Sequence, residues 1–404
     1  MIKLIKVYKY KLYPNNKQNT RMFNIASATR FAYNWALSFA LTYFKNNKKF
    51  ISEYDLTKEF TKYKKDNTWL YEYPNNSLKQ AVKNAGRAVI TTFMQNKKNG
   101  TNNEVRFKKK FKTTSTIYLD SCQVKFTNNS VKLDMIALSK KQNRKVINFI
   151  RLSNKHKIPL NCNSFINPTV KFDGINWYIT CGVDVSNNVQ TKDSVSLEDG
   201  LGIDLGIKDL AICSNKSVFP NINKTKDVKK LIKGYKHQQR KLSRQMLINR
   251  DSNNKVIYTN NINKQIHTLK KLSKHLTNVR TNYIYNVINS ILNQKPKFIA
   301  IENLNVKGMM KNKHLSKAIQ NQKFYEFRRI LIYKCNWLDI PLVAIDTFYP
   351  SSKKCSVCGS IKKDLKLKDR TYVCECCNTI IDRDYNASIN IREEGRRLLS
   401  LSSA

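Results

Sequence analysis

The stretch Gly202-Ile203-Asp204-Leu205-Gly206-Ile207 is typical of a buried β-strand, and a second strand is expected at Leu210–Ser214. Asp204 stands in the middle of the apolar run. Burying a carboxylate there is costly unless it is paired or bound to a metal ion. Taken alone, Asp204 could also be a structural aspartate that caps a turn. Which of the two roles it has depends on the residues that share its sheet.

Two further acidic positions stand where predicted elements end or begin. Glu302 follows the apolar strand expected at 297–301, and Asp382-Arg383-Asp384 precedes a helix expected at 385–399. Each has an ordinary explanation alone: a solvated strand end for Glu302, and the favourable helix dipole for the aspartates. Together, an acid within a strand, one at a strand end and one at a helix start can converge at one sheet edge. Three close carboxylates repel unless cations neutralise them, and two Mg²⁺ ions about 4 Å apart would do so and support phosphodiester hydrolysis.

The cysteines between the second and third acids have the spacing of a zinc site. Cys355-x2-Cys358, fifteen residues and Cys374-x2-Cys377 predict two knuckles that hold one structural Zn²⁺ in a closed tetrahedron. Cys376 breaks the two-residue gap and is interpreted as a spectator. The remaining cysteines are interpreted as core thiols of a reducing compartment: Cys122, Cys162, Cys181, Cys213 and Cys335.

The charge of the chain indicates a polyanionic partner. Among 404 residues, Lys and Arg number 74 against 28 Asp and Glu, a formal net charge of +46. Such an excess repels itself unless a polyanion neutralises it, which favours nucleic acid. A Lys- and Asn-rich proteome is the alternative, but it does not explain the scarcity of acids. No apolar run reaches the roughly 20 residues that span a bilayer, and the N-terminus lacks a signal-peptide core. We therefore expect a cytoplasmic protein that does not enter a membrane.

The first half of the chain predicts a β-rich domain interrupted by helices. A strand is expected at 2–13, and helices are expected at 18–44 and from Ser77 to a loop at 99–103. Short β-rich runs separated by turn residues follow at 115–119, 131–133, 146–152 and 177–183. We expect the N-terminal strand to join these runs in one sheet, with the helices as an insertion.

The second half begins after a polar linker at 186–198. A helical stretch at 228–292, interrupted at 251–254, predicts an antiparallel hairpin, and a further strand is expected at 342–345. The predicted domains are a β-rich domain (1–14 and 104–190), a helical lobe (15–103), a nuclease domain (198–354 and 378–404) and a zinc ribbon (355–377).

With these pieces in order, the chain resembles the TnpB/OrfB family of insertion sequences, relatives of the type V CRISPR effector nucleases. The resemblance rests on six stretches: 9–14, 106–110, 202–206, 301–304, 351–359 and 382–387. It implies an α/β multidomain protein. Its RuvC-like, RNase H-type domain carries an inserted zinc ribbon and follows a small β-domain with a helical insertion. The family's catalytic acids map onto Asp204, Glu302 and, by the Asp-x-Asn-Ala register, Asp384, with Asp382 beside them or capping the helix. Two departures are Asn378, where the second knuckle usually has Gly, and Tyr285-Asn286, where His-Lys often stands.

The resemblance also implies a function. Family members bind an RNA made from the transposon end and use it to cleave target DNA beside a short adjacent motif. We therefore expect an Mg²⁺-dependent endonuclease that acts as a monomer with guide RNA and target DNA. Basic and aromatic residues interleave at 106–112, and no recognition helix of a helix-turn-helix is evident. A non-catalytic, DNA-binding zinc-ribbon accessory protein of a transposon is the alternative. An actin-like sugar kinase, suggested by the Gly-Ile-Asp-Leu-Gly string, is disfavoured because the chain has only 11 Gly.

Overall fold

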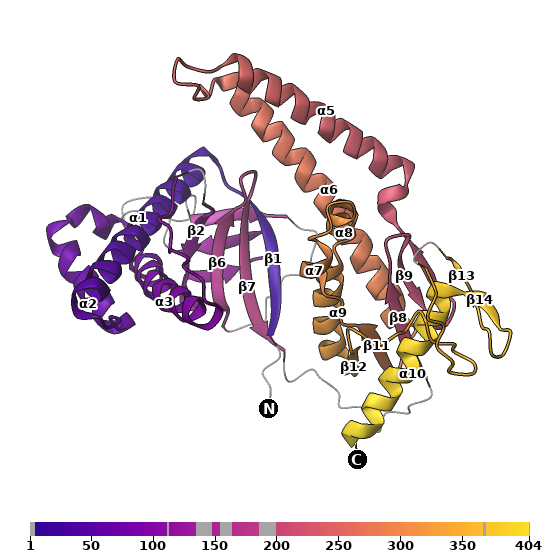
Figure 1. Cartoon of the computed structure of the whole chain (residues 1–404). Coiled ribbons are helices and arrows are strands. Elements are labelled where there is room, and N and C mark those ends of the chain that lie inside the picture. The colour runs from indigo at the N-terminus through magenta and orange to yellow at the C-terminus, as the bar shows by residue number, and fades with distance from the viewer. Residues whose placement is uncertain are drawn as a thin grey trace. The chain divides into compact units, whose positions relative to one another are not determined.

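The computed structural model describes residues 5–110, 113–134, 148–153, 164–185, 199–366 and 369–403 (Figure 1). The chain divides into two compact units, residues 1–186 and 187–404. The predicted linker at 186–198 lies outside the described residues. No helix in the described ranges is both long enough and apolar enough to cross a membrane.

The described part of the first unit contains a seven-stranded antiparallel sheet in the order β2-β6-β7-β1-β5-β4-β3. The strands are β1 (Ile5–Tyr13), β2 (Ser115–Tyr118), β3 (Val124–Phe126), β4 (Ser130–Leu133), β5 (Phe149–Leu152), β6 (Ile166–Phe172) and β7 (Trp177–Asp184). The N-terminal strand β1 lies between β7 and β5, which confirms that it joins the later strands in one sheet. Tyr10, Leu12 and Trp177 are buried in the core of this sheet.

Three helices stand between β1 and β2, as the insertion predicted. They are α1 (Asn16–Asn47), α2 (Glu53–Asp66) and α3 (Asn75–Asn99). Asn15 begins α1 in a capping box with Gln18, since each side chain accepts the other's backbone N–H at 2.9 Å. Gly100 ends α3 in the left-handed conformation, with φ at 61°. Helix α2 was not predicted, because only Leu56, Phe60 and the stem of Lys64 are buried along it.

The second unit contains a five-stranded sheet in the order β10-β9-β8-β11-β12. Its strands are β8 (Gly200–Leu205), β9 (Asp209–Cys213), β10 (Val218–Pro220), β11 (Phe298–Glu302) and β12 (Leu342–Ile345). Strands β8, β11 and β12 are parallel to one another, β9 is antiparallel to β8, and β10 is antiparallel to β9 and therefore runs in the direction of β8. This mixed order is the RNase H-type sheet, so the predicted RuvC-like fold class is confirmed.

Helices cover both faces of this sheet. On one face, Ile299 and Ile301 share a core with helices α6 (Asn260–Asn293) and α9 (Phe324–Leu338). On the other face, Phe298 and Ala300 pack with Ile391 of α10 (Arg383–Ser403). A strand turns successive side chains to opposite faces, so the apolar run 298–301 serves both cores. The short helices α7 (Val306–Met309) and α8 (Ser316–Gln322), like α9, were not predicted.

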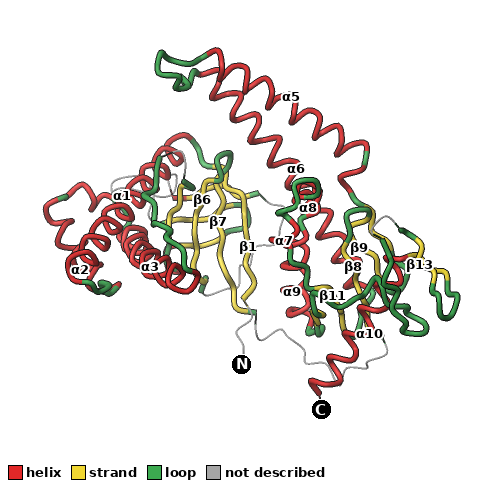
Figure 2. Tube along the Cα trace, in the orientation of Figure 1, coloured by secondary structure: helices red, strands yellow, loops and turns green. Residues whose placement is uncertain are grey.

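The predicted helical hairpin is formed by α5 (Lys226–Ile248) and α6, which pack along each other (Figures 1 and 2). Only Val228 and Leu242 are buried on α5. The lysines singled out from the sequence are exposed on these two helices: Lys229, Lys230, Lys270 and Lys271. The hairpin therefore presents a largely basic, solvated surface.

Candidate active site and metal cluster

Strand pairing brings Asp204 and Glu302 side by side. Strands β8 and β11 are parallel, with Ile203 opposite Ile301, so the next residue of each strand is Asp204 and Glu302. Neighbouring strands lie about 4.8 Å apart. Gly202 and Ala300 face α10, and the period of two puts both acids on that same face. The sheet therefore presents two carboxylates together toward α10.

Helix α10 supplies the third carboxylate, because it lies directly on the sheet. A Cβ on Gly202 would approach the backbone oxygen of Ser388 to 2.0 Å, and one on Gly395 would approach Ala300 Cβ to 2.4 Å. These two glycines allow the close approach. Asp384 lies in the first turn of this helix, where the dipole favours a negative charge.

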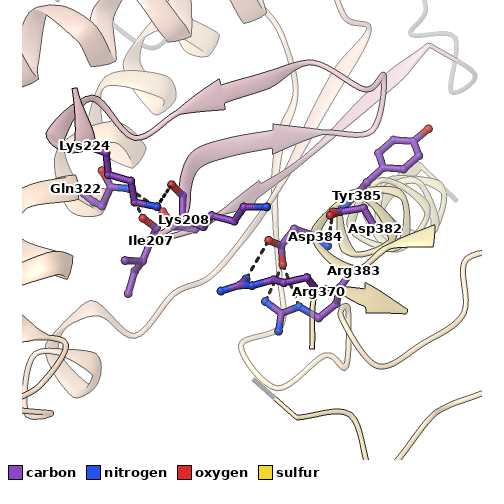
Figure 3. Close-up of polar contacts among 10 residues, drawn as sticks. Ile207, Lys208, Lys224, Gln322, Arg370, Asp382, Arg383, Asp384 and Tyr385 are labelled. Atoms are coloured by element: carbon purple, nitrogen blue, oxygen red, sulfur yellow. Dashed lines mark hydrogen bonds and ion pairs between the residues drawn. The ribbon is translucent and has the colours of Figure 1, made fainter. Parts of the chain in front are cut away.

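Asp382 caps α10 rather than joining the pair of strand acids. Its carboxylate accepts the backbone N–H groups of Asp384 and Tyr385, each at 3.0 Å (Figure 3). This is the cap that was one of the two predicted roles for Asp382. The cap fixes the start of the helix and leaves the Asp384 side chain to point elsewhere.

The charges of Glu302 and Asp384 both act on Asp204, which fits their approach from the neighbouring strand and from α10. Burial raises the pKa of Asp204 well above its ordinary value, and the charges on Glu302 and then Asp384 raise it further. Asp204 keeps some exposed surface, yet protein atoms surround it closely enough for burial to be the largest cause. Burial also raises the pKa of Glu302, although the Ser351 hydroxyl, which donates to Glu302 Oε1, opposes that rise. The charge of Arg383 opposes the rise in the pKa of Asp204 and that of Asp382 adds to it, and the net rise means that a bound cation would favour the ionised carboxylate.

Two arginines contact Asp384. Arg383 reaches Asp384 Oδ1 with Nε at 3.0 Å and Nη2 at 2.8 Å, and Arg370 Nη1 lies 3.5 Å from Oδ2 (Figure 3). These guanidinium groups would compete with a metal ion for the carboxylate. The pairing could not be predicted from the sequence, because neither arginine stands in a pattern that distinguishes it from the other Lys and Arg residues, 74 in all.

The turn that follows β8 is fixed by side chains from other elements. Gln322 donates to the backbone oxygen of Gly206 at 3.0 Å, and Lys224 donates to that of Lys208 at 2.9 Å (Figure 3). Both contacts hold the chain just after Asp204. Buried Gln322 is a further residue that sequence analysis missed.

The four predicted zinc ligands form a compact cluster. The Sγ atoms of Cys355, Cys358, Cys374 and Cys377 all lie within 4.8 Å of one another. The Cys355–Cys377 and Cys358–Cys374 sulfur distances are 3.7 and 3.5 Å. A tetrahedral zinc with Zn–S bonds of about 2.3 Å needs sulfurs about 3.8 Å apart. The donor set therefore fits Zn²⁺. Among the described residues this is the only such group of four closely spaced ligand atoms.

Local hydrogen bonds lower the pKa of two of these thiols, Cys358 and Cys374, whereas burial raises the pKa of Cys355 to about 11. Ser360 Oγ lies 3.1 Å from both Cys358 Sγ and Cys374 Sγ. This hydroxyl, followed by backbone N–H groups, lowers the pKa of Cys374 to about 6. The two knuckles use left-handed residues at matching positions, Gly359 with φ at 77° and Asn378 with φ at 54°. Asn378 therefore keeps the tight turn that its departure from Gly put in doubt, since Asn tolerates this conformation.

Buried asparagines join the zinc cluster to α10. Asn386, fully buried, accepts the backbone N–H of Ser356 at 2.9 Å and donates to the Lys354 oxygen at 2.7 Å. Asn390 donates to the backbone oxygens of Ser351 and Lys354 at 2.8 and 2.6 Å. The spacing of four residues puts both amides on one face of the helix. Two asparagines four residues apart on one helix face could have indicated this contact from the sequence, but it was not predicted.

Two expectations about individual side chains need correction. Cys181, Cys213 and Cys335 are buried as predicted, but Cys122 is exposed because it lies in the short surface turn Ser121–Gln123; Cys162 lies outside the described residues. Within the basic stretch 106–112, Lys108 is half-buried, with its Nζ 3.6 Å from the centre of the Tyr33 ring. It packs against α1 and is poorly placed to follow phosphates. Phe111 and Lys112 lie outside the described ranges.

Three family models match the chain. A helix-turn-helix domain of IS605 OrfB matches residues 1–49, a probable transposase of IS605 OrfB matches 183–313, and a Cas12f1-like TNB domain matches 324–391. The described part of the first match is strand β1 followed by α1, which is one helix without a turn.

Known proteins resemble the chain over most of its length. The Escherichia coli K12 protein named "Putative RNA-guided DNA endonuclease InsQ" is 24% identical over 99% of this chain and 94% of its own length. The Streptomyces pristinaespiralis protein named "Putative RNA-guided DNA endonuclease" is 24% identical over 96% of this chain and 89% of its own length. The solved Cas12f1-sgRNA-target DNA complex shares the fold, with a TM-score of 0.58, 16% identity, and coverage of 93% of this chain and 82% of that one.

Proposed function

We propose that this chain is an RNA-guided DNA endonuclease of the OrfB/TnpB family of insertion sequences, with Asp204, Glu302 and Asp384 as its catalytic acids. The matches to the IS605 OrfB models and to the Escherichia coli relative support the family. One observation carries the proposal. Strand pairing and helix packing direct carboxylates of β8, β11 and α10 to one face of an RNase H-type sheet, where burial and then the charges of Glu302 and Asp384 raise the pKa of Asp204. Carboxylates gathered at such a cost suit metal-dependent chemistry on a phosphodiester.

The residues fit Mg²⁺ because this ion prefers hard oxygen ligands such as these carboxylates, although Arg383 and Arg370 would have to release Asp384. Bound there, Mg²⁺ would activate water and stabilise the leaving oxygen. Asp204, Glu302 and Asp384 would hold the metal, and Ser351 orients Glu302 by donating to one of its oxygens. The cysteine cluster would hold Zn²⁺ and support the start of α10 through Asn386 and Asn390.

Guidance by RNA is supported by the names of the relatives and by the charge of this chain. The proposed partners are an RNA from the transposon end and a target DNA. The predicted domain boundaries remain part of the proposal: the β-rich domain and helical lobe would grip the guide–target duplex, which demands a wide positive surface rather than a recognition helix.

The experiment gives target DNA and Mg²⁺ to RNA-free protein and, separately, to protein carrying its transposon-end RNA. We expect cleavage at a defined site only with the RNA, and cleavage at a new site when the 3′ guide segment is changed. Equal, sequence-blind cutting without RNA would reject the guidance while leaving the nuclease. DNA binding with no cleavage in either arm would favour the non-catalytic accessory protein.

A further inference from the structure

A cavity of about 460 Å³ opens at the C-terminal end of β11, and Glu302 is the one of the three acids that forms part of its wall. This volume lies within the roughly 300–1,000 Å³ typical of ligand-binding clefts. The lining comes from the end of β11, from α7 and α9, and from the loop after β12. The lining residues that matter for its chemistry are Asn303, Lys307, Phe324, Tyr325, Arg328 and Phe348.

The cavity combines exposed aromatic rings with cations. Phe348 is 91% exposed and Tyr325 is 70% exposed, whereas Phe324 beside them is buried in the core. An almost fully exposed Phe gains nothing for folding. Arg328 and Lys307 bring positive charge to the same walls. Flat apolar rings next to cations are the surface on which nucleobases stack while phosphates pair with Arg and Lys.

The loop that carries Phe348 is tied to the strand that carries Glu302. Thr347 Oγ1 donates to the backbone oxygen of Asn303 at 2.8 Å, and the Phe348 N–H is donated to Asp346 Oδ1 at 2.7 Å. Arg328 Nη1 also donates to the Asn303 side chain. The same loop continues to Ser351, which orients Glu302. The rings and the catalytic acid are thus held on one small framework.

We propose that this cavity binds an unpaired base of the DNA strand that is being cut, stacked on Phe348 and Tyr325, with Arg328 and Lys307 at the neighbouring phosphates. The inference rests on the proposed nuclease function and adds a subsite to it. A cavity of this size admits one nucleotide but not a duplex, so the base must leave its stack before it enters. Holding it next to Glu302 fixes the scissile phosphate relative to the carboxylates.

The first test scans the substrate. Single-stranded targets complementary to the guide, each with one abasic site at a different position near the cut, are given to the wild-type protein–RNA complex and to Phe348→Ala and Tyr325→Ala complexes. Base–aromatic stacking predicts that the wild type loses about 5-fold to 100-fold in kcat/KM at one position. The alanine variants should lose a similar factor on intact DNA but nothing further at that position. Phe348→Trp should restore the wild-type profile.

Tyr258→Ala serves as the matched control, because Tyr258 is 62% exposed but lies in the connection between α5 and α6. Its abasic profile should equal that of the wild type. An unchanged profile in Phe348→Ala and Tyr325→Ala, with cleavage intact in both, would overturn the subsite while the nuclease assignment stands.

A second test does not depend on cleavage. A short single-stranded DNA with one 2-aminopurine is titrated into the full-length protein–RNA complex carrying Asp204→Ala. We expect the fluorescence to be quenched, and the quenching to be lost when Phe348→Ala is added. Quenching that does not depend on Phe348 rejects the proposal even if the protein proves not to be a nuclease. Equal, Phe348-dependent binding of the same sequence as RNA would assign the cavity to RNA and reject the DNA strand.

Discussion

The second unit gathers two sets of side chains that are proposed as metal ligands, and they reach their positions by different routes. The four cysteines lie within residues 355–377, and two knuckle turns bring each pair together locally. The three carboxylates come from positions 204, 302 and 384, and only strand pairing and the packing of α10 unite them. The cysteine cluster therefore depends on local chain geometry, whereas the carboxylate cluster depends on the whole fold of the unit.

The two routes are joined at one point. Strand β14 (Ile380–Asp382) pairs with β13 (Thr371–Val373) inside the zinc-binding segment and runs directly into α10. Asp384, a proposed catalytic acid, thus follows directly after a strand that pairs with the cysteine-containing segment. We therefore expect that a change which disrupts the cysteine cluster also displaces Asp384 and reduces cleavage.

The largest effect is expected from removing a carboxylate. Asp204→Ala, Glu302→Ala and Asp384→Ala should each reduce cleavage by on the order of 1,000-fold or more, because each removes a charge that would hold the metal. Binding of guide RNA and target DNA should persist, since it depends on phosphate contacts elsewhere. Cleavage kinetics and filter binding measure the two properties.

The acidic control for these variants is Asp227→Ala, which alters an exposed residue in the first turn of α5 and should cleave normally. Asp382→Ala should weaken the cap of α10 and reduce activity only partly. Full loss of cleavage in Asp382→Ala with activity retained in Asp384→Ala would show that the third acid was assigned wrongly.

Breaking the zinc cluster should have the next largest effect. Cys355→Ser and Cys374→Ser should lose bound Zn²⁺ and reduce cleavage by roughly 10-fold to 100-fold, because metal loss unfolds the segment that positions Asp384. Elemental analysis and cleavage rates are measured on the same reduced samples. Cys376→Ser is the matched control and should keep both zinc and activity, since its sulfur lies outside the cluster. Full activity in zinc-free protein would break the proposed link between the two sites.

The contrast between the two routes also explains what could be predicted from the sequence. The zinc ligands follow from spacing alone, because two residues between cysteines impose a local geometry. Asp204, Glu302 and Asp384 could be proposed because each stands at a recognisable strand or helix position. The contacts of Arg383 and Arg370 with Asp384, the Ser351–Glu302 hydrogen bond and the cavity beside Phe348 could not. They depend on tertiary packing between segments whose sequences show no periodic pattern. Helices α7 to α9 were not predicted for the same reason.

A smaller effect is expected where the zinc segment is anchored to α10. Asn390→Ala removes a buried amide that donates to two backbone oxygens and leaves both without that partner. The free energy of unfolding should fall by about 1–3 kcal/mol. Asn278→Ala, on the exposed surface of α6, should change it by less than about 0.5 kcal/mol. Chemical denaturation measures both. Equal stability of the two variants would show that the anchor contributes nothing.

The smallest effect compares the two knuckles with each other. Gly359 and Asn378 both adopt the left-handed conformation, but only the first is a glycine. A Cβ at position 359 would meet nothing closer than Lys354 Cε at 3.9 Å, so Gly359→Ala tests backbone strain alone and should cost about 1–2 kcal/mol. Asn378→Gly relieves the corresponding strain, but it also adds conformational freedom to the unfolded chain, so it should change the free energy of unfolding by less than about 1 kcal/mol.

Thermal unfolding and the retention of zinc against a chelator measure the effects of both substitutions. Gly359→Ala should release zinc at a lower chelator concentration than the wild type, and Asn378→Gly should match or exceed the wild type. If Asn378→Gly instead loosens zinc as much as Gly359→Ala does, the Asn378 side chain contributes a contact to the second knuckle that its conformation alone does not explain.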